Sequence, residues 1–239
     1  MRRNLLLAAL AGAVMLATLM VSPAQAGPLY FRQYGLGVSD LQFQAPFYLR
    51  TFAGELMVDH TASGSTSDDF AVFCVDIMNP KSVIQDVTIR PLSEMPDNGN
   101  PSTVQPDAGD RVAWLLNQYG TEPWLATDGN FRAAALQIAI WEVLYDPFNG
   151  YNVTSGNFIW LHATYDSPTQ KAVYGYTTLY LNALGNNRSE ALWYDVSLQG
   201  EKGQDFARAL AVPEPGSTMM LLASGLAGLG WFARRLKRA

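Results

Sequence analysis

The sequence has little of what metal and redox sites usually require. Among its 239 residues there is one cysteine, Cys74, and there are two histidines, His60 and His162. A single cysteine excludes an internal disulfide framework and a zinc site built from several thiolates. Two histidines leave few ligands for a histidine-based metal centre. We therefore expect the chain to use neither a metal nor an organic cofactor.

Positive charge is also scarce in the central part of the chain. Residues 27–212 carry ten basic and twenty acidic side chains, a net charge of −10. A body this acidic lacks the basic surface that nucleic-acid binding requires. Hydrophobic residues make up 49% of the chain and charged residues only 15%, which excludes disorder over the whole length. The central region is long enough to bury one sizeable core.

The first 26 residues are typical of a secretory signal peptide. Arg2 and Arg3 form a positive start, an apolar run follows, and Ala24-Gln25-Ala26 places small residues at the cleavage site. We expect signal peptidase to cut after Ala26. The alternative is an anchor that is not cleaved.

The C-terminal segment, 213–239, predicts a second targeting signal. Pro213-Glu214-Pro215 is followed by an apolar run, predicted as a transmembrane helix over 217–233, and by a basic tail that would lie in the cytoplasm. These three parts in this order resemble the PEP-CTERM sorting signal of Gram-negative bacteria. The resemblance implies processing by an exosortase, an inner-membrane intermediate, and a final place at the cell surface or in the matrix of a bacterium that makes exopolysaccharide. The alternative is a permanent membrane anchor.

Between the two signals, strand-like segments precede helical ones. Aromatic and β-branched residues predict strands within 29–60, 70–77, 82–90 and 191–198. Helical spacing predicts helices over 107–119, over 130–145 with Asn130 as its cap, and from Ser167-Pro168 to Gly185. This order predicts an α+β domain over 27–199, with an antiparallel β-sheet or barrel and a helical subdomain. A polar stalk is expected over 200–212.

Two residues in apolar surroundings suggest a chemical role for this domain. Cys74 lies in Phe73-Cys74-Val75-Asp76, and Gln137 lies in Leu136-Gln137-Ile138-Ala139-Ile140-Trp141. A buried carboxamide needs hydrogen-bond partners. Attack by a cysteine thiolate, with loss of ammonia, would convert the pair into an internal thioester. The alternative is that Cys74 is an inert, small hydrophobic residue of the core.

These motifs resemble the thioester domain of bacterial surface adhesins. That family has an aromatic-Cys motif on a strand and a Thr-Gln-x-Ala-x-Trp-type motif on a helix, although Leu136 replaces the threonine here. The resemblance implies that Cys74 and Gln137 form the thioester, with Phe73 and Trp141 as walls that exclude water. Such a domain would capture an amine-bearing protein or exopolysaccharide once, and would not be a turnover enzyme.

Several other interpretations stay open at this stage. Glu142 and Asp76 are candidate proton acceptors for the acyl chemistry, and the acidic pairs Asp68-Asp69 and Asp107/Asp110 could bind calcium. Trp124, Trp160 and Trp193 could contribute to a sugar-binding face of a non-covalent structural or matrix protein. A secreted enzyme would need a convergent histidine or carboxylate site, and no motif predicts one.

Overall fold

The computed structural model describes residues 26–45, 47–61, 67, 69–77, 84–95, 107–146, 150–161, 167–196 and 203–210. Residues 1–25, His162, the Pro-Glu-Pro motif and the helix predicted over 217–233 lie outside the described residues. Within the described part of the chain, no helix is long and apolar enough to cross a membrane.

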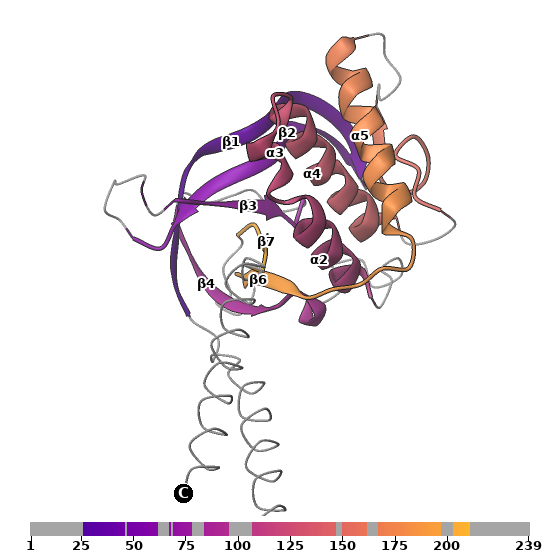
Figure 1. Cartoon of the computed structure of the whole chain (residues 1–239). Coiled ribbons are helices and arrows are strands. Elements are labelled where there is room, and N and C mark those ends of the chain that lie inside the picture. Colours follow the sequence, from indigo (N-terminus) through magenta and orange to yellow (C-terminus); the bar gives the residue numbers. More distant parts are fainter. Residues whose placement is uncertain are drawn as a thin grey trace, which may run out of the picture.

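Antiparallel strands form the larger part of the fold. They pair in the order β2-β3-β7-β6-β4-β1-β5, and β1 pairs with β2 as well. The sheet is curved (Figure 1) but does not form a clear barrel. The predicted antiparallel sheet is therefore confirmed, and the predicted barrel is not. The strands are β1 (Ala26–Ala45), β2 (Phe47–Asp59), β3 (Phe70–Cys74), β4 (Ile84–Pro91), β5 (Ile159–Leu161), β6 (Ala191–Asp195) and β7 (Phe206–Ala209).

The helices gather on one side of this sheet, as Figure 1 shows. All three predicted helices are present. They are α2 (Ala108–Tyr119), α4 (Gly129–Tyr145) and α5 (Pro168–Leu184); the short η1 (Leu92–Glu94) precedes α2, and the short α3 (Glu122–Leu125) lies between α2 and α4. Helix α4 contacts β1, β2, α2, α3 and α5, which makes it the centre of the helical layer.

Helix α4 is buried on all sides. Every residue from Ala133 to Tyr145 is buried, including Gln137 and Glu142. A helix that is apolar all round is stable only when other elements cover it completely. The sequence Ala133-Ala134-Ala135-Leu136 lets neighbouring elements approach closely on every face. Any polar group on this helix must therefore find its partners inside the protein.

Two local predictions are wrong. Asn130 does not cap α4, because the helix begins at Gly129 after Asp128, and the Asn130 side chain instead accepts a hydrogen bond from the Gly37 amide. The stalk predicted over 200–212 contains β7, which pairs between β3 and β6. This strand has only four residues, and its polar flanks conceal it from pattern-based prediction.

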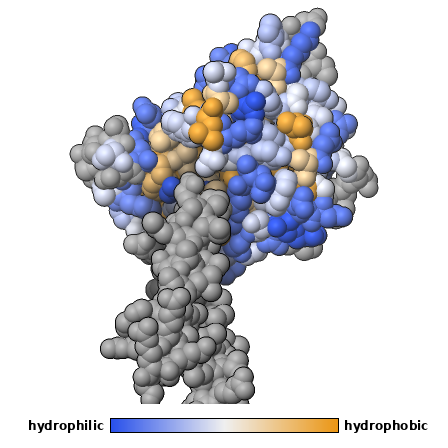
Figure 2. Space-filling view, in the orientation of Figure 1, coloured by the Kyte–Doolittle hydropathy of each residue, from blue (hydrophilic) through white to orange (hydrophobic). Residues whose placement is uncertain are grey.

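The face of the molecule that Figure 2 shows is mostly hydrophilic. The face seen in Figure 2 carries separate, small apolar patches on a polar background. Among the described residues, the exposed large side chains include Trp124 and Leu125 on α3. Most other described aromatic residues lie in the core or pack against it.

Candidate functional site

The candidate site lies where strand β2 leaves strand β3. The two strands pair from Val58↔Phe70 to Leu56↔Val72, where their pairing ends; had this register continued, Gly54 would lie opposite Cys74, two positions further along. Gly54 has a φ of 148° and stays paired with Gly37 of β1, on the other edge of β2. A Cβ on Gly54 would lie 2.3 Å from the Leu36 carbonyl oxygen, so this bend requires glycine. The amide and carbonyl of Cys74 consequently lack a partner strand on this side.

The side chain of Gln137 takes the place of the missing strand. The Cys74 amide donates to Gln137 Oε1 at 2.9 Å, and Gln137 Nε2 donates back to the Cys74 carbonyl oxygen at 2.8 Å. Both residues are almost completely buried. The carboxamide is therefore fully engaged and held in one orientation against Cys74. The structure thus brings together the two residues that the sequence predicts as a pair, here as a thiol and an amide.

The thiol of Cys74 sits in a dry, polar-lined niche. Its Sγ contacts the Asp76 carbonyl oxygen at 3.1 Å, and Gln204 Nε2 donates to the sulfur at 2.8 Å. Burial raises the pKa of the Cys74 thiol far above its usual range, and the nearby negative charge of Asp76 adds to this effect. The group is consequently a neutral thiol rather than an activated thiolate.

The two predicted wall residues have different positions. The Trp141 indole N–H lies close enough to favour the thiolate form of Cys74, which acts against the rise in its pKa, yet it completes no well-aligned hydrogen bond. The Trp141 ring packs edge-on against Phe43, with centroids 5.4 Å apart, and closes the core side of the site. Phe73 is also buried, but neighbouring side chains of a strand point to opposite faces. Phe73 therefore faces away from Cys74.

The acidic candidates also differ in their placement. Glu142 lies about 140° around the helix from Gln137, and its Oε1 accepts the Asn152 amide at 2.5 Å. Burial raises the pKa of Glu142 to about 8, and its second oxygen has no hydrogen-bond partner. Because Glu142 faces away from the pair, Asp76 is the candidate that lies beside the thiol.

Sequence reasoning missed two residues that border the site. Gln204 lies just before β7, and its amide also donates to the Asp76 carbonyl oxygen at 3.1 Å. Tyr145 lies two helical turns after Gln137, and its hydroxyl accepts the Ile77 amide at 3.1 Å. The spacing of Gln137, Trp141 and Tyr145, each four residues apart, is a signal that could have identified Tyr145. No comparable signal exists for Gln204.

The other predicted candidates have structural partners. His60 stacks against Phe70, with ring centroids 5.2 Å apart. Asp107, part of a proposed calcium pair, forms ion pairs with Arg111 and Arg188, which neutralise it. Among the described residues, no group of three histidine, cysteine or acidic side chains is placed to hold a metal ion.

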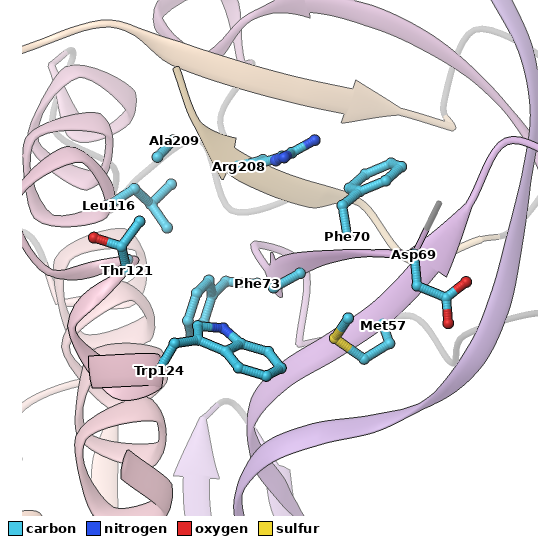
Figure 3. Close-up of a pocket in the computed structure, with 11 residues that line it drawn as sticks. Met57, Asp69, Phe70, Phe73, Leu116, Thr121, Trp124, Arg208 and Ala209 are labelled. Carbon is cyan, nitrogen blue, oxygen red and sulfur yellow. The ribbon is translucent and has the colours of Figure 1, made fainter. Parts of the chain in front are cut away.

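A separate cleft opens on the other face of β3. It has a volume of about 310 Å³ and lies between the strands and the segment that joins α2 to α3 (Figure 3). Its lining includes the apolar side chains of Met57, Phe70, Phe73, Leu116 and Trp124 and the polar side chains of Asp69, Thr121 and Arg208.

Comparison with known families identifies the C-terminal segment. The family described as the PEP-CTERM protein-sorting motif matches residues 211–235. The chain therefore carries the signal of an exported protein that an exosortase processes, with a membrane-anchored intermediate and a final location at the cell surface. Comparisons with curated proteins and with solved structures find no match.

Proposed function

We propose that this exported surface protein binds a partner covalently, through an internal thioester between Cys74 and Gln137. The observation that carries the proposal is the double hydrogen bond between the Gln137 carboxamide and the main chain of Cys74. It holds the reacting side chains on adjoining elements inside a buried niche. The resemblance to adhesin thioester domains supports the same assignment.

The hydrogen bond from the Cys74 amide would assist the bond-forming step. The Cys74 sulfur would attack Cδ of Gln137, the Cδ–Nε2 bond would break, and the nitrogen would leave as ammonia with the thiol proton. Negative charge would develop on Oε1, which already accepts the Cys74 amide at 2.9 Å. A donor fixed in advance at such an oxygen stabilises the transition state. The unpartnered Trp141 indole is a second donor in the same niche.

The second step would attach the partner. An amine nitrogen would bond to Cδ of Gln137, the Cδ–Sγ bond would break, and one amine proton would pass to the sulfur. The product is an amide between Gln137 and the partner, with the Cys74 thiol restored. Gln204, which donates to Sγ at 2.8 Å, would stabilise the departing sulfur. Asp76 is the acidic group placed to relay the proton. The reaction consumes the thioester, so the domain acts once and is not a turnover enzyme.

Targeting fits this role. We propose that signal peptidase cuts after Ala26, that the basic tail stays in the cytoplasm, and that exosortase acts near Pro213-Glu214-Pro215. The domain would then face amine-bearing proteins or exopolysaccharide outside the cell. The described strand β1 begins at Ala26, so cleavage there would leave the strand almost intact.

A structural role for Gln137 is the second candidate. Its carboxamide already satisfies the two main-chain groups of Cys74 that β2 leaves unpaired. In this case the protein would be a non-covalent surface or matrix component, with Cys74 as core. The two candidates differ in one covalent bond, so they differ in mass.

Intact mass of the purified full chain tests the proposal. The wild type is expected to be lighter than its sequence by one ammonia, and methylamine should add its own mass and free one thiol. Cys74→Ala and Gln137→Glu should show their full sequence masses and no adduct. The Glu variant keeps the shape of Gln137 but has no ammonia to lose. A wild-type chain at full mass, with an unmodified thiol after denaturation, would refute the thioester.

A further inference from the structure

Among the described arginines, one forms no ion pair with a described carboxylate. The described chain contains seven arginines, and six of them form ion pairs with carboxylates: Arg32, Arg50, Arg90, Arg111, Arg132 and Arg188. Arg208 forms none within the described residues. In a region with a net charge of −10, acidic side chains are plentiful. Arg208 lines the cleft, so it is the candidate there for pairing with an anion from outside.

The position of Arg208 is fixed by aromatic neighbours. Its guanidinium carbon lies 4.5 Å from the centre of the Phe70 ring, and it interacts with the Tyr194 hydroxyl. Contacts of this kind hold the planar cation while leaving its N–H groups free to bind a carboxylate. Figure 3 shows Arg208 and Phe70 together at one side of the cleft. The charge is thus presented to the cleft in a defined orientation.

The opposite wall of the cleft offers a flat apolar surface. Trp124 lines the cleft although 56% of it is exposed, and its side chain lies close enough to Glu55 to act against the rise in the pKa of that carboxyl. Phe73 continues the apolar lining from Trp124 toward the arginine, and Met57 lies to one side near Asp69 (Figure 3). Asp69, the acidic residue of the lining, lies 3.9 Å from Arg32, which offsets its charge. Among the described lining residues, Arg208 is therefore the charge that no described carboxylate offsets.

We propose that this cleft binds a uronic-acid unit of an acidic polysaccharide. The apolar face of the sugar ring would stack on Trp124, and its carboxylate would pair with Arg208. A volume of about 310 Å³ admits one sugar ring with part of its neighbour. Arginine pairs with carboxylates in a two-pronged geometry that neutral sugars cannot supply. The inference is independent of the thioester, because Phe73 faces the cleft and Cys74 faces the core.

Calorimetric titration of the full chain in detergent, with two matched ligands, tests the proposal. Trigalacturonate is the acidic probe, and its methyl ester keeps the rings but removes the charge. Wild-type protein should bind the acid about tenfold to a hundredfold more tightly than the ester, the range expected for one charge-assisted pair. This preference should shrink as salt is raised.

Variants separate the two contacts. Arg208→Gln should abolish the preference for the acid, whereas Arg50→Gln removes the same charge from an exposed position outside the cleft and should preserve it. Trp124→Ala should weaken both ligands together. Equal affinity of wild-type protein for acid and ester, or no binding of either, would overturn the proposal. Because this comparison uses the wild type, it does not depend on the folding of any variant. Cys74→Ala should bind the acid as the wild type does, whatever the outcome of the mass experiment.

Discussion

Replacing Gln137 with methionine would test whether its carboxamide completes the sheet. Methionine has a similar length and shape but neither donates nor accepts a strong hydrogen bond. The Cys74 amide and carbonyl would each lose the partner that now lies 2.9 and 2.8 Å away. Both groups are buried, and water cannot replace the lost bonds without opening the core.

The expected cost follows from these two groups. A buried main-chain group left without a partner costs about 1–3 kcal/mol, so the pair should cost about 2–6 kcal/mol. The loss in the free energy of unfolding caused by Gln137→Met is best measured in a Cys74→Ala background. No thioester can form there, so only the hydrogen bonds contribute. Urea unfolding of the full chain in mild detergent, followed by tryptophan fluorescence, would give the difference.

Ile140→Met is the matched control. Ile140 is fully buried on the same helix, and a volume-conserving apolar exchange there should cost less than about 1.5 kcal/mol. If Gln137→Met costs no more than Ile140→Met, the carboxamide does not satisfy the strand, and the argument from the missing β2 partner fails.

Two further predictions concern stability. Burial raises the pKa of Glu142 from 4.5 to about 8, so the folded state retains this proton to a higher pH than the unfolded state does. The free energy of unfolding should therefore fall as the pH rises from about 4.5 to about 8. In the Glu142→Gln variant this fall should be smaller by about 2–5 kcal/mol. Melting temperatures at pH 5 and pH 8 would test this, and an unchanged pH slope in the variant would contradict it. Gly54→Ala should destabilise the domain by more than about 2 kcal/mol, because the new methyl group meets the Leu36 carbonyl oxygen and φ is positive. Gly175→Ala, in a helix with open space around it, should instead stabilise the domain by about 0.5–1 kcal/mol. Equal changes in the urea midpoints of the two variants would refute the claim that the bend at Gly54 requires glycine.

The strongest sequence signals were periodic and local. The helices over 107–119 and 130–145 could be predicted because their apolar residues recur at helical spacing over many turns. The Cys74 and Gln137 segments attracted attention because each sets one reactive group in an apolar run. Their contact in the structure agrees with the expectation that the two segments meet, while the covalent bond stays a prediction.

The features that sequence reasoning missed depend on contacts between distant segments. Strand β7 has four residues, too few for a periodic signal, and it becomes a strand because β3 and β6 flank it. Gln204 reaches the thiol only through that pairing. The position of Arg208 at the cleft could not be predicted from composition, because it depends on which carboxylates the other described arginines contact.

The hydrogen bonds at Gln137 bear on structure and chemistry at once. A glutamine that only filled the gap left by β2 would need the same donor and the same acceptor as a glutamine held for attack, so the geometry alone supports both roles. The surroundings of the Cys74 thiol distinguish the structural role of Gln137 from the chemical one better than the hydrogen bonds do. Gln204 and the Trp141 indole bring two N–H groups toward the sulfur, although a neutral thiol is a weak acceptor. Donors gathered around a sulfur serve best when that sulfur carries charge, as it does when a thioester forms or opens. If both proposals hold, β3 would present a cleft for reversible capture of an acidic glycan on one face and a bond for covalent capture of an amine on the other.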